Sequence, residues 1–194
     1  MVGLLKDQSK EKFKSDIWVN VFLLLLILAG AFIAGMKIWS DYVESGRSRL
    51  ISFITSKNEK ERDPQDQNSI TIGKDGKIIA IRIRGSINEI NELKKTTDKD
   101  LRHILNKLVE LGDASEVERL VLNTGNITDI KGIEHLENLK YLEMKVMPGI
   151  NDKDLNYLKG MRNLEVLNLD ETKVKGDGLE HLVGCKILKK LILS

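Results

Sequence analysis

One pattern of apolar residues recurs along the second half of the chain at a nearly constant interval. It occurs four times, as Val117/Leu120/Leu122, Leu139/Leu142/Met144, Leu164/Leu167/Leu169 and Leu188/Leu191/Leu193. The interval is about 22 to 25 residues. The segments between these sets also recur, as 132–136 (GIEHL), 154–158 (DLNYL) and 178–182 (GLEHL). A repeat of this length predicts a stack of similar coils, because each coil can bury its apolar face only against its neighbours.

The motif L-x-x-L-x-L, followed by T-x-V-x-x-x-G-L, resembles the leucine-rich repeat, in a short variety similar to bacterial repeat proteins. The resemblance covers roughly residues 78–194. It implies an α/β fold, a short leucine-rich-repeat solenoid with parallel strands on the concave face and helices or loose turns on the convex face. It also implies a binding scaffold rather than an enzyme. The asparagine that the family often places after the strand is replaced by Gly125, Met147 and Thr172, so a ladder of side-chain hydrogen bonds at that position is expected to be weak.

An uncharged stretch of twenty residues, 17–36, precedes the repeats. Its length matches the roughly 30 Å hydrocarbon core of a bilayer, so the sequence predicts one transmembrane helix with Trp18 and Trp39 near its ends. A cleaved signal peptide is the alternative, because lysines precede the stretch and residues 29–31 offer a small-residue cleavage pattern. The run continues past that pattern, which favours a retained anchor. The single apolar stretch predicts a single-pass protein of the cell or inner membrane. A slight excess of basic residues before it predicts the orientation, with a cytoplasmic amino terminus and the repeat domain outside.

The composition divides the rest of the chain into segments. Residues 1–16 are predicted to be a charged tail, and residues 37–55 an amphipathic helix on the membrane surface or against a partner. Residues 56–69 are predicted to be a flexible linker, residues 70–116 a hairpin with the first strand and an amino-terminal cap, and residues 117–194 the repeats. Within the membrane stretch, four small residues are predicted to let another helix pack closely, namely Gly30, Ala31, Ala34 and Gly35.

The sequence gives no sign of catalysis. The net charge is +2 with acids and bases interspersed, which excludes the basic surface of a nucleic-acid binder. His135 and His181 occupy the same position two coils apart, about 10 Å from each other, which is too far for a shared zinc ion. The single cysteine, Cys185, excludes a disulfide framework. We therefore predict no cofactor, no metal and no enzymatic activity.

Strand residues that lie between the leucines are expected on the concave face of the stack. The predicted protein-binding residues there are Arg82, Arg84, Asn123, Glu143, Lys145, Asn168, Asp170 and Ile192. The leading hypothesis is a membrane-anchored protein–protein interaction module, an accessory or scaffold subunit whose partners are the bilayer and other membrane protein subunits. The alternative is a receptor or sensor subunit that binds a peptide or glycan on the concave face. The last strand has no cap, so a homodimer through its edge is a further alternative.

Overall fold

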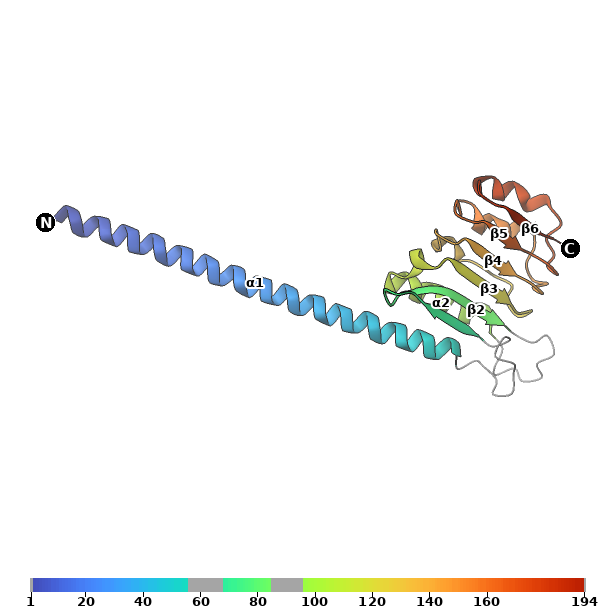
Figure 1. The fold of residues 1–194 in the computed structure, drawn as a ribbon, viewed down its shortest axis with the longest axis horizontal. Helices are drawn as coiled ribbons and strands as arrows, with labels where there is room; N and C mark the ends of the chain where they lie inside the picture. Colours follow the sequence, from blue (N-terminus) through green and yellow to red (C-terminus); the bar gives the residue numbers. More distant parts are fainter. Residues whose placement is uncertain (1, 56–67, 85–95, 194) are drawn as a thin grey trace. The chain divides into compact units, whose positions relative to one another are not determined.

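The computed structural model describes residues 2–55, 68–84 and 96–193, with the backbone alone for residues 2–24, 26 and 27. The chain divides into two compact units, Met1–Ser45 and Gly46–Ser194. Figure 1 labels α1, α2 and the strands β2 to β6. In the names used here, η denotes a 3-10 helix. In chain order the helices and strands are α1 (Val2–Thr55), β1 (Ser69–Ile72), β2 (Ile78–Arg84), α2 (Asp98–Leu111), η3 (Ala114–Glu116), β3 (Arg119–Asn123), η4 (Ile133–His135), β4 (Tyr141–Met144), η5 (Asp152–Leu158), β5 (Val166–Asn168), η6 (Asp177–Gly184) and β6 (Lys190–Ile192).

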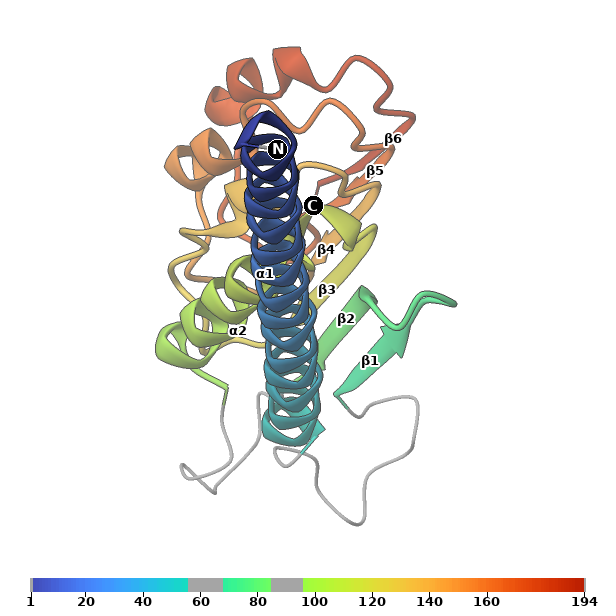
Figure 2. The same cartoon turned by 90° about the vertical axis from the view of Figure 1, so that its left-hand side faces the viewer.

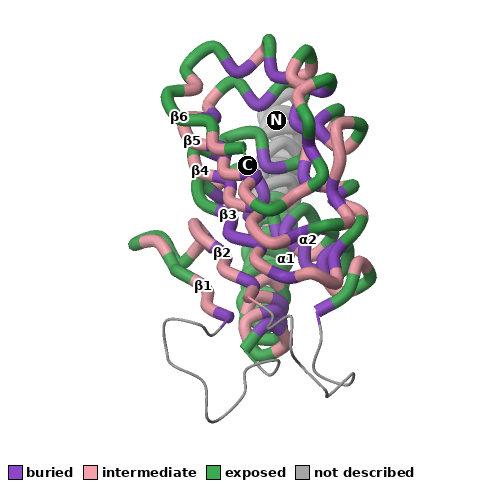
Figure 3. The backbone as a smooth tube through the Cα atoms, turned by 90° about the vertical axis from the view of Figure 1, so that its right-hand side faces the viewer, coloured by how far each residue is buried: buried purple, intermediate pink, exposed green. Residues whose placement is uncertain are grey.

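The second unit is built on one sheet whose spatial order, β1 to β6, is also the order in the chain. Strands β2 to β6 are parallel, and α2 and the short helices lie on one side of them (Figure 2). The strand register aligns Ile81, Leu120, Leu142, Leu167 and Leu191 in one row. The first four are almost fully buried, and buried residues recur on successive strands, as the purple segments of Figure 3 show. The leucine pattern therefore arises because each strand turns the same position towards the core.

The predicted fold class is wrong as stated. The chain is an α/β protein with a mixed sheet, because β1 pairs with β2 in the antiparallel sense and makes a hairpin. The turn of this hairpin is closed by a hydrogen bond of 2.8 Å from the Gly73 N–H to the Lys77 carbonyl, and Gly76 takes the left-handed conformation with φ of 80°. A residue without a side chain adopts that conformation at little cost.

The predicted transmembrane helix is also wrong. No helix within residues 2–55, 68–84 and 96–193 combines the length and the apolar character that crossing a membrane requires. Helix α1 does not end at residue 36 but continues unbroken to Thr55, and Lys37, Asp41 and Glu44 follow the described apolar residues within about two turns. The predictions of a membrane span over residues 17–36, of a single-pass membrane protein and of its localisation are corrected accordingly.

From Val2 onwards, three of the predicted segments, 1–16, 17–36 and 37–55, fall within the single helix α1. The predicted linker lies outside the described residues up to residue 67. The final turns of α1 belong to the second unit, where Leu50 and Ile54 are buried. The apolar positions at this end of the predicted amphipathic helix are thus covered by the chain itself.

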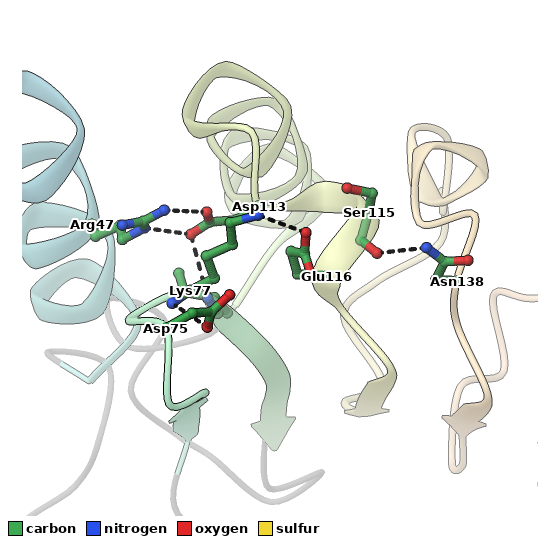
Figure 4. Close-up of polar contacts among 8 residues, drawn as sticks. Arg47, Asp75, Lys77, Asp113, Ser115, Glu116 and Asn138 are labelled. Atoms are coloured by element: carbon green, nitrogen blue, oxygen red, sulfur yellow. Dashed lines mark hydrogen bonds and ion pairs between the residues drawn. The ribbon is translucent and has the colours of Figure 1, made fainter. Parts of the chain in front are cut away.

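A buried ion pair joins the end of α1 to the segment after α2. The Arg47 Nε donates to Asp113 Oδ2 at 2.8 Å, and Nη2 donates to Oδ1 at 2.6 Å (Figure 4). The Asp113 side chain has no exposed surface, and its Oδ2 also accepts the N–H of Ile78, at 3.4 Å. This two-pronged geometry holds α1, β2 and the segment after α2 together through one carboxylate.

Helix α2 is fixed at both ends by local contacts. The Thr97 N–H donates to Asp100 Oδ2 at 2.9 Å, which satisfies a backbone donor at the start of the helix. Gly112 ends the helix in the left-handed conformation, with φ of 73°. Five apolar residues on one face are buried, namely Leu101, Ile104, Leu105, Leu108 and Leu111. The helix therefore covers the amino-terminal part of the core.

Candidate functional site

The strand register brings the eight predicted concave-face residues onto one face of the sheet, which we call the polar face. Arg82, Glu143, Asn168 and Ile192 lie in a single row that also contains Val121. Arg84 and Asn123 form the next row, and Lys145 and Asp170 continue it just beyond β4 and β5. Side chains alternate between the two faces of a strand, so these positions all point away from the leucine core.

Glu143 lies at the centre of a connected set of polar contacts on this face. One carboxylate oxygen accepts the Tyr141 hydroxyl at 2.6 Å, and the other accepts the Asn123 amide at 2.7 Å. Asn123 in turn accepts the backbone N–H of Lys145 at 3.3 Å, and the Lys145 ammonium lies 2.8 Å from an Asp170 oxygen. These contacts link strands β3, β4 and β5 side by side.

Arg119 and Tyr141 belong to this set, although sequence reasoning did not select them. The Arg119 guanidinium lies over the Tyr141 ring, 3.9 Å from its centroid, in a cation–π contact. The two residues pair with each other in the strand register, two positions before the row that contains Arg82 and Glu143. The sequence contains the signal for this. Arg119 lies two positions before Val121 and Tyr141 two positions before Glu143, so each shares a face of the sheet with that residue.

The surroundings of Glu143 hold it in the charged form. Burial by itself would raise the pKa of this carboxyl, but hydrogen bonds from Tyr141 and Asn123, together with the positive charges of Arg84 and Lys145, outweigh it, and the pKa is lowered. Burial and the hydrogen bond to Glu143 raise the pKa of Tyr141. At neutral pH, then, Tyr141 keeps its proton and donates a hydrogen bond, and the ionised carboxylate of Glu143 accepts it.

We expect Tyr141→Phe to raise the pKa of Glu143, because it removes a hydrogen bond that favours the charged form. The pKa of Glu143 is below that of the unfolded chain, about 4.3. Its contribution to stability is therefore present above that value and is lost as the pH falls through the folded-state pKa. An NMR titration of the Glu143 side-chain carboxyl measures the change. Tyr157→Phe, on η5, is the matched control and should leave the midpoint in place; equal midpoints in all three proteins would contradict the assignment.

A second set of contacts joins successive coils at the start of the strands. The backbone carbonyl of one residue in each coil accepts two N–H groups from the next coil, which identifies a set of equivalent positions. These positions hold Glu118, Lys140, Glu165 and, in the last coil, Lys189. Their charges alternate in sign. Lys140 pairs with Glu118 at 2.6 Å, and Lys189 pairs with Glu165 at 2.7 Å. We call this set the charge ladder; its sequence signal is the residue directly after the first apolar residue of each repeat.

An asparagine ladder lies beside it. The Asn138 amide donates to the Ser115 carbonyl at 2.8 Å, and the Asn163 amide donates to Asn138 Oδ1 at 2.8 Å (Figure 4 shows the first contact). These asparagines precede the strand, whereas the ladder predicted to be weak would have followed it. The same position in the last coil is held by Ile187, which is exposed.

The carboxyl-terminal end of the sheet leaves large apolar side chains uncovered. Leu191 is 37% exposed, although its register equivalents Leu142 and Leu167 are fully buried. Strand β6 pairs with β5 on one side, and no strand of the described residues pairs with its other side. We define the open end as this outer edge of β6 together with four exposed residues, Val183, Ile187, Leu191 and Leu193.

The predicted helix-packing residues stay a prediction. Gly30, Ala31, Ala34 and Gly35 are exposed, and a side chain added at Gly30 or Gly35 would meet no atom within 4 Å. Burial raises the pKa of the Cys185 thiol, which suits a core residue and not a nucleophile. In the described ranges, no group of three or more histidine, cysteine, aspartate or glutamate side chains could hold a metal ion.

No protein-family model, no curated protein and no solved structure matches this chain. The likeness to leucine-rich repeats therefore stays a prediction from the sequence.

Proposed function

We propose that this chain is a non-enzymatic protein–protein interaction module, an accessory or scaffold subunit that binds its partner at the open end. The observation that supports this proposal is the exposure of Leu191, whose equivalents in the earlier coils are buried. Covering apolar surface is worth about 25 cal/mol per Å². An open strand edge also presents unpaired backbone groups that another strand can satisfy. Both features favour a partner that adds a strand to β6.

The charge ladder indicates which strand fits. Lys189 ends the ladder, and its side chain is 71% exposed even though it contacts Glu165. A strand that adds parallel to β6 and carries an acidic residue at its start would continue the alternation of charge. Apolar residues further along the same strand would cover Leu191. The partner we propose is therefore an extended segment with an acidic residue followed by alternating apolar residues.

A homodimer through β6 fits these features less well. Two copies related by a two-fold axis would pair their β6 strands in the antiparallel sense. In a pairing centred on Leu191, Lys189 would lie opposite Leu193 of the second copy and would meet no acidic group. A heterologous partner strand satisfies both the apolar and the charged positions.

A synthetic peptide tests the strand chemistry directly. A peptide that copies residues 160–172 carries Glu165 at the ladder position and the leucines of the preceding coil. We expect it to bind the full chain and to shift the amide NMR resonances of β6. The same peptide with Glu165→Lys should bind at least several-fold more weakly. If the two peptides bind equally well, or if the resonances that move lie outside β6, the proposed partner chemistry is wrong.

The interaction itself is tested with the native complex. After purification with its stoichiometric partner, Leu191→Glu should raise the dissociation constant by about tenfold or more, because a charge replaces an apolar contact. Val109→Glu introduces the same charge at an exposed apolar position of α2 and should leave affinity unchanged. A chain that sediments as a monomer and brings no stoichiometric partner would contradict the proposal.

A second candidate function is a receptor or sensor subunit that binds an extended peptide or glycan on the polar face. The observation in its favour is Arg82, which brings a positive charge to this face and has no carboxylate partner among the described residues. The combined substitution of Arg82, Asn123 and Asn168 separates the two functions. Loss of ligand binding with intact assembly at the open end would favour the receptor.

A further inference from the structure

A small hollow lies on the polar face where β1, β2 and β3 meet. Its volume is about 30 Å³, and its polar lining residues are Ser69, Thr71, Arg82 and Arg119. The strand register sets Ser69 opposite Arg82, and Ala80 opposite both Thr71 and Arg119. Two hydroxyl-bearing residues and two arginines thus line one place, which we call the basic hollow; the guanidinium of Arg119 itself lies over the Tyr141 ring.

Arg82 supplies an unused hydrogen-bond donor to this place. Its Nε is buried and has no hydrogen-bond partner among the residues that the structure describes. A buried donor without a partner destabilises the fold, since it has lost water and gained nothing in return. Such a donor on a binding face is expected to find its partner in a ligand.

Arg82 forms no ion pair with a carboxylate among the described residues. Glu143 stays charged but accepts its hydrogen bonds from Tyr141 and Asn123, and Glu118 is paired with Lys140. Arg82 and Arg119 lie on neighbouring strands one diagonal step apart, where like charges repel each other. An anion beside Arg82 would reduce this repulsion and satisfy the unused donor.

We propose that the basic hollow binds the carboxylate of an acidic side chain in an extended peptide. The Nε and an Nη of one guanidinium form a fork that matches the two oxygens of a carboxylate, and the hydroxyls of Ser69 and Thr71 add donors. The volume suits a group of this size. The inference rests on the second candidate function, since it names the ligand group that the polar face would recognise, and it is independent of the open end.

The test uses the full chain, isotope-labelled, and two blocked peptides of valine and threonine that differ in one central residue, glutamate or glutamine. We expect the glutamate peptide to shift the Arg82 Nε–H resonance and the β1 amides in a saturable way, and the glutamine peptide to leave them in place. Arg82→Gln should weaken binding of the glutamate peptide by about tenfold or more. Arg162→Gln removes the same charge at an exposed position on another coil and should leave binding unchanged.

Thr71→Val keeps the inference testable if Arg82→Gln does not fold, because it removes only one hydroxyl from an exposed strand position. It should weaken the glutamate peptide by a smaller factor. Equal binding of the two peptides, or unchanged binding by Arg82→Gln, would overturn the inference. A shift of the Arg82 resonance by inorganic phosphate without any shift by the glutamate peptide would also overturn it, and would mark the hollow as a site for a free anion.

The receptor function can fail separately. If the glutamate peptide binds at Arg82 while Asn123→Ala and Asn168→Ala leave the affinity of longer peptides unchanged, the carboxylate site stands and recognition along the polar face fails. Leu191→Glu should leave binding at the basic hollow intact in either case, because Leu191 lies on the core side of the last strand.

Discussion

Replacing Arg47 with methionine is expected to lower the free energy of unfolding by about 3–5 kcal/mol. Arg47 is the cation that the structure sets against the Asp113 carboxylate, which is completely shielded from water. Without the guanidinium, a buried negative charge would lose both of its charged hydrogen bonds and keep only the weak contact with the Ile78 N–H. Chemical denaturation of the full chain, followed by the signal of the sheet, measures the loss.

Arg102→Met is the matched control. It removes a guanidinium that also contacts a carboxylate, that of Asp129 at 2.7 Å, but in this pair both side chains are well exposed. Its expected cost is below about 1 kcal/mol, because water screens and replaces exposed pairs. Adding Asp113→Leu to Arg47→Met should recover much of the lost stability, since the uncompensated charge is then gone. If Arg47→Met and Arg102→Met lower the free energy of unfolding by similar amounts, the claim that burial makes the Arg47–Asp113 pair important is wrong.

Leu142→Ala is expected to destabilise the fold by about 2–5 kcal/mol, the range for deleting a fully buried leucine side chain and leaving a cavity. The same change at Leu191 is a control within the same register row. Leu191 is the partly exposed member of that row, so less apolar surface returns to water, and the expected cost is about 1 kcal/mol or less.

Denaturation of the isolated chain and of the complex distinguishes these two positions further. When the partner occupies the open end, the cost of Leu191→Ala should rise towards that of Leu142→Ala. An equally large loss at Leu191 in the isolated chain would mean that the side chain is already covered. In that case the open end would not be a binding surface.

The leucine rows could be predicted from the sequence because their cause is local and repeated. Each strand must turn the same position to the core, so Leu120, Leu142 and Leu167 recur at nearly equal intervals and fall in register. The alternation of side chains along a strand then placed the polar residues on the other face. For the same reason, the sequence alone could have placed Tyr141 and Arg119 on the same face as Glu143.

The contacts between distant segments could not be predicted in this way. Arg47 and Asp113 are 66 residues apart and belong to no repeat, so no periodic signal links them. The basic hollow depends on the register of β1 against β2, which a bulge shifts between Thr71 and Ile72. The end of the amino-terminal helix could not be predicted either, because its apolar run gives way to charged residues while the backbone continues helically up to Thr55.

The two margins of the sheet are unlike, and this has a consequence for how copies of the chain can assemble. The first margin is β1, which runs antiparallel to β2 and carries a bulge between Thr71 and Ile72. Bulged strands resist pairing with a neighbour. The bulge therefore makes β1 a poor strand for a second copy to offer to β6. This disfavours the growth of an exposed β-strand into fibres.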